Sequence, residues 1–388
     1  MLRPVKLFSR RGRVLRVLVI HLAGLGDTLM LTPALAALDD RYPDAKIDLV
    51  TLHPYVKAAF ESQVRLDHIT TLPAYPGQWI IERFADKAGL RLLLATIRFY
   101  PQLLLKLAFR RYDIGISFAL SDFDQSFGNA LLFCLDIRAR IGLRGRNDRL
   151  LTDVANIDFR KMHRVDAYLN FLKPLGIATA NRDYEYRARE VDSQSVNQLL
   201  QNWNIDCSRP LAVIHPGGKL HINSRRWPAE YFARVCSFLL NEGFEILISG
   251  DRDDAAACDD VAHACGNGAK SVAAQLNFSQ TAALLQQCDL VITNDTATLH
   301  LAEAMNVQHV VSIFGPTDPA LLVPQNERHL VFRSHLPCAP CMGGIIDAKT
   351  ERCPRDVKEE CLLQTTPEQV IGALKRFYTK PAARALSR

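Results

Sequence analysis

The sequence contains no run of about 18 uninterrupted apolar residues, so no membrane-spanning helix is expected. A convincing secretory signal is also missing, because the apolar run at 14–20 is short and leads into Gly24 and Asp27 without a small-residue cleavage site. There is no low-complexity segment and no internal sequence repeat. These absences favour a globular protein of the cytoplasm.

Two common nucleotide-binding motifs are absent as well. Gly24-x-Gly26-x-x-Leu29 lacks the third glycine of a dinucleotide fingerprint, and no Gly-Lys-Ser/Thr phosphate loop occurs. The excess of positive charge is small, +6 from 47 Lys and Arg against 41 Asp and Glu, so no nucleic-acid partner is expected. The excess gathers in two clusters that suit either phosphates and an anionic membrane or plain solvation: Arg3, Lys6, Arg10, Arg11, Arg13 and Arg16, and Arg138, Arg140, Arg144, Arg146 and Arg149.

The length of 388 residues, with 48% hydrophobic and 23% charged residues, is what two domains of a soluble protein require. Both halves alternate apolar, strand-like segments with helical ones, which predicts parallel βαβ units. The polar stretch at 177–195 has no clear period and is interpreted as an interdomain linker. The predicted strands are 14–20, 46–51, 112–118, 211–215, 244–249, 288–293 and 309–314, and helices are predicted after Gly26 and at 165–175 and 228–242.

Asp27 is the ionisable residue on the turn after the first predicted strand. Open α/β sheets bind their ligands at the carboxyl ends of parallel strands, so Asp27 is a candidate general base. Gly24 and Gly26 allow a tight turn at this point. A second role stays open, in which Asp27 or Thr28 caps the next helix and Pro33 falls within its first turns.

Two loops in the second half suit a phosphorylated ligand. The strand at 211–215 ends in His215-Pro216-Gly217-Gly218, whose backbone N–H groups can bind an anion. Arg225 and Arg226 precede a predicted helix, and two guanidiniums at a helix N-terminus suit a diphosphate. The alternative is a solvated basic loop.

A third polar segment follows the strand predicted at 288–293. Asp295, Thr296 and His300 combine an acid, a hydroxyl and an imidazole, which suit sugar hydroxyls and phosphate oxygens. Thr296 or Thr298 is expected to cap the next helix, with His300 one turn into it. The alternative is a capped helix with a buried histidine.

The segment 90–109 is predicted to form one or two amphipathic helices. These helices either lie on a membrane, cover an acceptor cleft or pack into the core.

Four of the ten cysteines are grouped with the spacing C-x2-C-x11-C-x7-C, at Cys338, Cys341, Cys353 and Cys361. This spacing suits one tetrahedral ion, and the alternative is four reduced thiols without a metal. The other six cysteines are scattered, which is typical of small buried side chains.

Taken in order, these motifs resemble glycosyltransferase family 9, the ADP-heptose:lipopolysaccharide heptosyltransferases. The resemblance extends over residues 14–372 and rests on several motifs in the family's order. These are Gly24-Leu25-Gly26-Asp27 with its Thr-Pro-Ala-Leu continuation, His215-Pro216-Gly217, Arg225-Arg226-Trp227-Pro228, Asn294-Asp295-Thr296-Ala297-Thr298-Leu299-His300 and Phe314-Gly315-Pro316-Thr317-Asp318.

The resemblance implies an α/β protein of the GT-B fold, in which two Rossmann-like domains with parallel sheets face each other across a central cleft. The expected domains are 1–185, which binds the acceptor, and 186–365, which binds the nucleotide-sugar. Residues 366–388 are expected to form a helix and tail that packs back on the N-terminal domain.

The resemblance also implies the reaction and its residues. Heptose passes from ADP-heptose to the inner core of lipopolysaccharide or another lipid-linked acceptor, with inversion, no required cofactor and no divalent metal. Asp27 matches the catalytic base, and Arg225 stands where the family often has Lys near the donor phosphates. The expected donor-binding residues are His215, Gly217, Gly218, Arg225, Arg226, Asp295, Thr296 and His300; the expected acceptor-binding residues are Gly26, Arg140, Arg144 and Arg146.

A lipid-linked acceptor places the expected site of action on the cytoplasmic face of the inner membrane. Protein heptosyltransferases of this group bind iron at a comparable cysteine cluster, so the four grouped cysteines are expected to hold a structural zinc or iron. Two alternative functions stay open, one with other substrates and one without catalytic activity. One transfers heptose to a protein or uses another nucleotide-sugar, and the other is a non-catalytic protein that binds sugar nucleotides or glycolipids.

Overall fold

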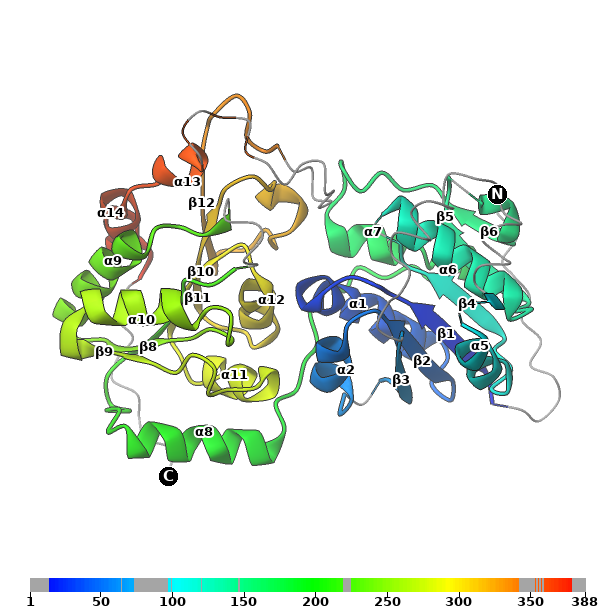
Figure 1. The fold of residues 1–388 in the computed structure, drawn as a ribbon, viewed down its shortest axis with the longest axis horizontal. Helices are drawn as coiled ribbons and strands as arrows, with labels where there is room; N and C mark the ends of the chain where they lie inside the picture. The colour runs from blue at the N-terminus through cyan, green and yellow to red at the C-terminus, as the bar shows by residue number, and fades with distance from the viewer. Residues whose placement is uncertain are drawn as a thin grey trace. The chain divides into compact units, whose positions relative to one another are not determined.

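The computed structural model describes residues 14–63, 65–72, 97–98, 100–119, 121–145, 147–218, 225–341, 353, 355, 357 and 359–378, without the side chains of residues 122, 123 and 267. The chain divides into two compact units, Met1–Glu185 and Tyr186–Arg388. Each unit contains its own sheet with helices packed on it (Figure 1). The predicted α/β class with two parallel sheets is confirmed.

Six parallel strands form the sheet of the first unit, in the order β3-β2-β1-β4-β5-β6. Its central strand β1 is rich in Val, Leu and Ile and is buried on both faces, as parallel sheets require. The strands are β1 (Arg16–Ile20), β2 (Lys46–Thr51), β3 (His68–Thr71), β4 (Ile114–Ser117), β5 (Ala139–Leu143) and β6 (Asp153–Ala155).

The described helices of the first unit pack around this sheet. Helix α1 contacts α2 and α7, while Leu107 of α5 and Phe127 of α6 join Leu18 of β1 in an apolar core. The helices are α1 (Leu25–Arg41), α2 (Pro54–Phe60), α5 (Pro101–Ala108), α6 (Asp122–Cys134) and α7 (Arg164–Asn170), with short 3₁₀ turns at Asp148–Leu150 and Lys173–Leu175.

The second unit repeats this topology. Its six parallel strands follow the order β12-β11-β10-β7-β8-β9, which is the order of the first sheet when each unit is numbered from its own first strand. The strands are β7 (Leu211–His215), β8 (Glu245–Ile248), β9 (Ala269–Ser271), β10 (Leu290–Asn294), β11 (His309–Phe314) and β12 (His329–Arg333).

The helices of the second unit include one near the end of the chain. Val370 and Leu374 of α14 are buried in the same core as Phe232 and Val235 of α9, so α14 belongs to the core of this unit. Packing of the C-terminal tail on the other unit stays a prediction. The helices are α8 (Glu190–Asn202), α9 (Ala229–Asn241), α10 (Ala255–Ala264), α11 (Phe278–Leu285), α12 (Ala297–Ala304), α13 (Glu360–Leu363) and α14 (Pro367–Phe377), with 3₁₀ turns at Gly266–Gly268 and Pro319–Leu321.

Each sheet has a switch point, where the order of the strands reverses. In the first unit it lies between β1 and β4, and in the second between β7 and β10. Open α/β sheets bind ligands beyond the carboxyl ends of the strands at this point. Asp27 follows β1, and Asp295 follows β10, so the two candidate carboxylates each lie at the switch point of their own sheet.

The predicted strands are all confirmed with small shifts at their ends, but three details of the helices were wrong. Pro33 lies in the interior of α1, not in its first turns. The helix predicted at 165–175 is interrupted, because α7 ends at Asn170 and a separate 3₁₀ turn contains Pro174. The predicted linker at 177–195 ends early, because α8 begins at Glu190.

The segment predicted as amphipathic at 90–109 is described in part, and residues 90–96 and 99 lie outside the described residues. In α5, Leu103 and Leu107 pack into the core, whereas Leu105 is 59% exposed. Within the part of the chain that the structure describes, no helix is both long and apolar enough to cross a membrane.

Candidate functional site

Asp27 is the third residue of α1, and it does not cap this helix. The N-cap is Gly24, and no side chain makes a capping hydrogen bond there. The Thr28 hydroxyl instead donates to the Gly24 carbonyl oxygen over 2.8 Å. The alternative in which Asp27 or Thr28 caps the helix is therefore wrong, because α1 begins at Leu25, three residues before the start that capping by Asp27 would require and four before the start for Thr28. The Asp27 carboxylate is 30% exposed at the positive end of the helix dipole.

Several polar and aromatic side chains surround Asp27. The Arg164 guanidinium of α7 places Nε 3.5 Å from Asp27 Oδ1. The Tyr55 ring stacks on His53, with 4.7 Å between the ring centroids, and its hydroxyl lies beside Gly24. Burial, together with the charge of Asp27, raises the pKa of Tyr55.

His21 lies directly after β1 and is fully buried. Burial lowers its pKa to about 3, although the backbone of Phe118 acts in the opposite direction, so the imidazole is neutral near pH 7. The Tyr168 ring meets it edge to face at 5.5 Å. Sequence reasoning missed His21, Tyr55 and Arg164, although His21 and Tyr55 both follow predicted strands closely.

The residues predicted to contact the acceptor differ in their surroundings. Gly26 is the second residue of α1. The Arg140 guanidinium donates to the backbone carbonyls of Leu150 and Ile137, so its donors serve the fold of the first unit. Arg144 is exposed, and Arg146 lies outside the described residues.

In the second unit, three of the predicted donor-site residues, Gly217, Gly218 and Arg226, pack around the Asp254 carboxylate. Asp254 Oδ1 accepts from the Gly218 backbone N–H at 3.0 Å and from Arg226 Nη2 at 2.8 Å. A Cβ on Gly217 would collide with the same carboxylate, so only glycine fits there. Arg226 also donates to the Gly218 carbonyl, so its guanidinium holds the loop in place.

His215 ends β7 and stands beside this clamp. Its Nε2 is 4.0 Å from Asp254 Oδ2, and Nδ1 is 3.5 Å from the Ser249 hydroxyl. Burial lowers the pKa of His215, although the Asp254 carboxylate acts in the opposite direction. Asp254 was not singled out from the sequence, because its role depends on a loop that lies far from it along the chain.

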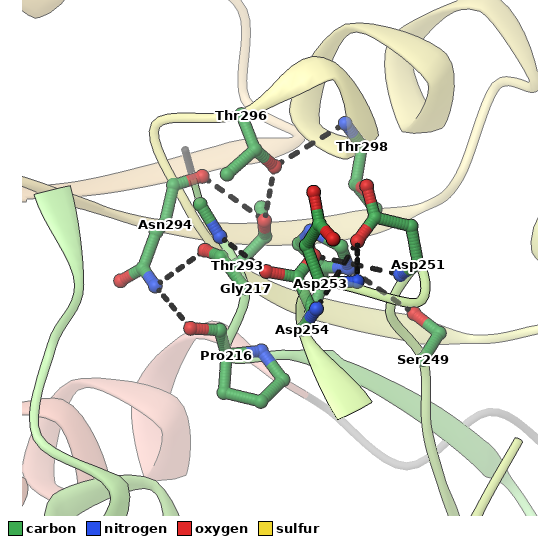
Figure 2. Close-up of polar contacts among 12 residues, drawn as sticks. Pro216, Gly217, Ser249, Asp251, Asp253, Asp254, Thr293, Asn294, Thr296 and Thr298 are labelled. Carbon is green, nitrogen blue, oxygen red and sulfur yellow. Dashed lines mark hydrogen bonds and ion pairs between the residues drawn. The ribbon is translucent and has the colours of Figure 1, made fainter. Parts of the chain in front are cut away.

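Asn294 connects the two loops at the switch point of the second sheet. Figure 2 shows its amide directed toward Pro216 and Gly217, to whose carbonyls Nδ2 donates at 2.9 and 3.0 Å. Its Oδ1 accepts from the backbone N–H of Trp227 at 3.1 Å. The loops after β7 and before α9 are therefore both anchored at the end of β10.

The predicted helix cap at Thr296 is confirmed. Its hydroxyl accepts from the Thr298 backbone N–H at 3.3 Å and contacts the Thr293 hydroxyl at 3.1 Å, as Figure 2 shows. His300 is the fourth residue of α12 and is buried. The N-terminus of α12 thus lies beside the Gly217 loop, where backbone N–H groups favour an anion.

Arg225 and Asp295 form an ion pair near the same strand end. Arg225 Nη1 is 3.3 Å from Asp295 Oδ2, and the two side chains are only 13% and 5% exposed. The Thr317 hydroxyl donates to that same oxygen at 2.6 Å. The sequence motif at 314–318 contains Thr317, but the sequence alone assigned it no role.

Three of the four grouped cysteines lie within electrostatic range of the fourth, Cys361. The pKa of Cys361 is raised to about 11, chiefly by burial and also by Cys341, Cys353 and Cys338. Across the described residues, however, no three His, Cys, Asp or Glu side chains are arranged to hold a metal ion. Four thiols nevertheless fit zinc or iron in their chemistry.

Comparisons with known proteins agree with this geometry. A family model described as glycosyltransferase family 9 (heptosyltransferase) matches residues 102–346, more than half of the chain. The lipooligosaccharide heptosyltransferase 2 of Haemophilus ducreyi is 22% identical over 378 residues, which cover 94% of this chain and 99% of that protein.

Solved structures show the same fold. A glycosyl transferase of family 9 from Veillonella parvula has a TM-score of 0.72 at 20% identity, with 93% of this chain and 96% of that chain covered. The Escherichia coli ADP-heptose lps heptosyltransferase II has a TM-score of 0.69 at 19% identity, with 94% and 98% covered.

Proposed function

Because the chain belongs to glycosyltransferase family 9, we propose that it transfers heptose from ADP-heptose to the inner core of lipopolysaccharide, inverting the anomeric centre without a metal ion. The E. coli neighbour is named for ADP-heptose and lipopolysaccharide, and the H. ducreyi relative for lipooligosaccharide, which supports both substrates. One observation carries the proposal: Asp27 in the first unit and the Arg225–Asp295 pair in the second each lie at the switch point of the sheet of their own unit.

Asp27 is the proposed general base. It removes the proton from an acceptor hydroxyl while that oxygen attacks the anomeric carbon from the side opposite the diphosphate. The bond from the anomeric carbon to the diphosphate oxygen breaks, and its electron pair leaves with ADP. A carboxylate that is 30% exposed, and not used as a helix cap, is available for this proton transfer.

The departing ADP carries negative charge, which the second unit is suited to stabilise. Arg225 supplies a guanidinium, and the N-terminus of α12 supplies backbone N–H groups. Gly217 and Gly218 leave a loop without side chains near this helix end. The further donor contacts predicted for His215, Arg226, Asp295, Thr296 and His300 stay predictions, with Arg226 acting through the loop that it holds.

The proposed acceptor site surrounds Asp27 in the first unit. Tyr55 offers a half-exposed aromatic ring beside the carboxylate, a surface on which the apolar face of a sugar can pack. Contacts from Gly26, Arg140, Arg144 and Arg146 to acidic or phosphorylated groups of the acceptor stay predictions.

A lipid-linked acceptor would require the enzyme to act at the cytoplasmic face of the inner membrane. Leu105 of α5 is 59% exposed and Phe109 is 83% exposed, with Lys106 and Arg111 nearby in sequence, which supports contact with an anionic lipid surface. Sedimentation with anionic and neutral vesicles tests this, and equal recovery in the supernatant with both would contradict it.

The zinc or iron predicted at Cys338, Cys341, Cys353 and Cys361 also stays a prediction. Metal analysis of protein purified without added metal tests it, because a tetrahedral site would retain close to one ion per chain. Content under about 0.2 ion per chain would end the idea and favour four reduced thiols.

The deciding experiment measures turnover with ADP-heptose and truncated lipopolysaccharide acceptors. We expect Asp27→Asn to lower kcat by about 10² to 10⁴-fold. We expect donor binding, measured by calorimetry, to stay unchanged, while Asp44→Asn in the exposed turn after α1 leaves kcat unchanged. Loss of donor binding together with turnover would contradict the role of Asp27.

The same assay separates the substrates. Turnover with a protein acceptor alone, or with another nucleotide-sugar alone, would favour those alternatives over lipopolysaccharide and ADP-heptose. The family match sets aside the hypothesis of a non-catalytic binding protein.

A further inference from the structure

Arg164 is the charged partner that the structure gives to Asp27. The two residues lie far apart in the sequence, yet Arg164 Nε is 3.5 Å from Asp27 Oδ1. The guanidinium is 1% exposed, whereas the carboxylate is 30% exposed. One end of the ion pair is therefore fixed inside the first unit, and the other end reaches solvent.

The surroundings of Arg164 hold it firmly. It is the first residue of α7, whose N-cap His163 accepts from the backbone N–H of Val165. Its guanidinium lies over the Phe159 ring, 5.0 Å from the centroid. Helix α7 packs directly against α1, the helix that carries Asp27.

Burying a guanidinium costs desolvation free energy, so a buried arginine that an apolar residue could replace is a candidate for a functional role. Removing such a charge from water requires several kcal/mol, and an apolar side chain of similar size often stabilises the same place equally well. Arg164 nevertheless occupies the interface between α1 and α7. The neighbouring His21 is neutral near pH 7, so it does not duplicate this positive charge.

We infer that Arg164 is a positioning residue for Asp27. It faces Oδ1 and holds the carboxylate in one orientation, which leaves Oδ2 to receive the proton of the acceptor hydroxyl. This inference rests on the proposed function, in which Asp27 is the general base. Arg164 acts only through Asp27 and touches neither substrate.

A purely structural role for Arg164 predicts something different. If Arg164 only connects α7 to α1, its removal lowers stability and affects kcat to the same degree whether or not Asp27 is present. A positioning residue acts through its partner, so the two substitutions are not additive. A double-mutant cycle on kcat therefore distinguishes the two roles.

The experiment compares the wild type with Arg164→Met, Arg164→Lys, Asp27→Asn and the double variant Asp27→Asn/Arg164→Met. We expect Arg164→Met to lower kcat by about 10- to 100-fold, because displacement of a catalytic group by about 1 Å has effects of this size. The KM for ADP-heptose stays unchanged, and Arg164→Lys recovers part of the loss. In the Asp27→Asn background, Arg164→Met changes kcat by less than about twofold.

Arg110→Met is the matched control, because Arg110 pairs with the buried Asp48 carboxylate of the same unit at 2.9 Å. We expect it to lower the melting temperature without lowering kcat. If Arg164→Met does not fold, Arg164→Lys in the two backgrounds completes the same cycle.

Two failures of the cycle are distinguishable. Equal losses of kcat from Arg164→Met in the presence and absence of the Asp27 carboxylate would overturn the positioning role. Full turnover by Asp27→Asn would instead overturn the proposed base, and the positioning role with it.

Discussion

The Thr317 hydroxyl donates to Asp295 Oδ2 over 2.6 Å, and the same carboxylate oxygen faces Arg225. All three side chains are largely buried at the carboxyl edge of the second sheet. A carboxylate with two such partners has little freedom to rotate. Thr317 thus sets the orientation of Asp295 toward Arg225, the pair proposed to bind the donor.

Replacing Thr317 by Val tests this relationship. The substitution keeps the shape of the side chain and removes a hydrogen bond to a charged group, which contributes about 1.5–3 kcal/mol. We expect the Kd for ADP-heptose to rise by about 10- to 100-fold, measured by calorimetry. Thr281→Val is the control, because the Thr281 hydroxyl donates to the Asn277 carbonyl within α11, on an element that does not contain Asp295 or Arg225. Equal Kd values for wild type and Thr317→Val would contradict the prediction.

Gly217→Ala is expected to weaken both the fold and donor binding. A Cβ at this position would collide with the Asp254 carboxylate and displace it from Gly218 and Arg226. Such overpacking costs about 1–3 kcal/mol of unfolding free energy, measured by denaturant titration.

Gly372→Ala provides the opposite control for that experiment. It lies in the interior of α14, and an added Cβ there meets nothing within 4 Å. The helix should gain about 0.5–1 kcal/mol, since alanine loses less backbone entropy than glycine. A stabilising effect from both substitutions would show that the Gly217 loop is not closed on Asp254.

Much of the fold follows from local pattern. The apolar runs at 211–215 and 309–314 coincide with β7 and β11, because buried parallel strands consist almost entirely of apolar residues. Asp27 and Asp295 could be placed at strand ends for the same reason. The positions of these two carboxylates at the ends of strands could therefore be predicted from the order of strands and helices alone.

The partners of these residues could not be predicted in this way. Arg164 reaches Asp27, and Asn294 reaches Pro216, through contacts between segments far apart in the chain. Local periodicity contains no information on such pairs. Pro33 was also misplaced, because a proline was expected in the first turns of α1, whereas in its interior the missing N–H is compensated by the Thr32 hydroxyl.

Tyr55 is expected to contribute to acceptor binding. Its ring stacks on His53 and lies near Asp27 with 46% of the residue exposed. We expect Tyr55→Ala to raise the KM for the acceptor by about 3- to 10-fold, because aromatic contacts contribute about 0.5–1.5 kcal/mol. Tyr55→Phe keeps the ring and should retain most of this affinity. A rise in the KM for ADP-heptose instead would assign Tyr55 to the donor.

The interior proline of α1 leads to a prediction about stability. Pro33 has no N–H to donate to the Leu29 carbonyl, and the Thr32 hydroxyl donates to that oxygen at 2.6 Å. The same hydroxyl accepts from the Glu185 backbone N–H at 2.9 Å. Thr32→Val leaves both backbone groups without these bonds, so we expect it to destabilise α1 by about 1–3 kcal/mol.

Pro33→Ala supplies the second arm of this test. Alanine restores an N–H for the Leu29 carbonyl, so the cost of Thr32→Val should fall by about 0.5–1.5 kcal/mol in that background, while the loss of the Glu185 contact remains. Hydrogen exchange of peptides from α1 measures the local free energy of opening, independently of the second unit. An identical cost of Thr32→Val in both backgrounds would show that the hydroxyl does not replace the bond that Pro33 cannot make.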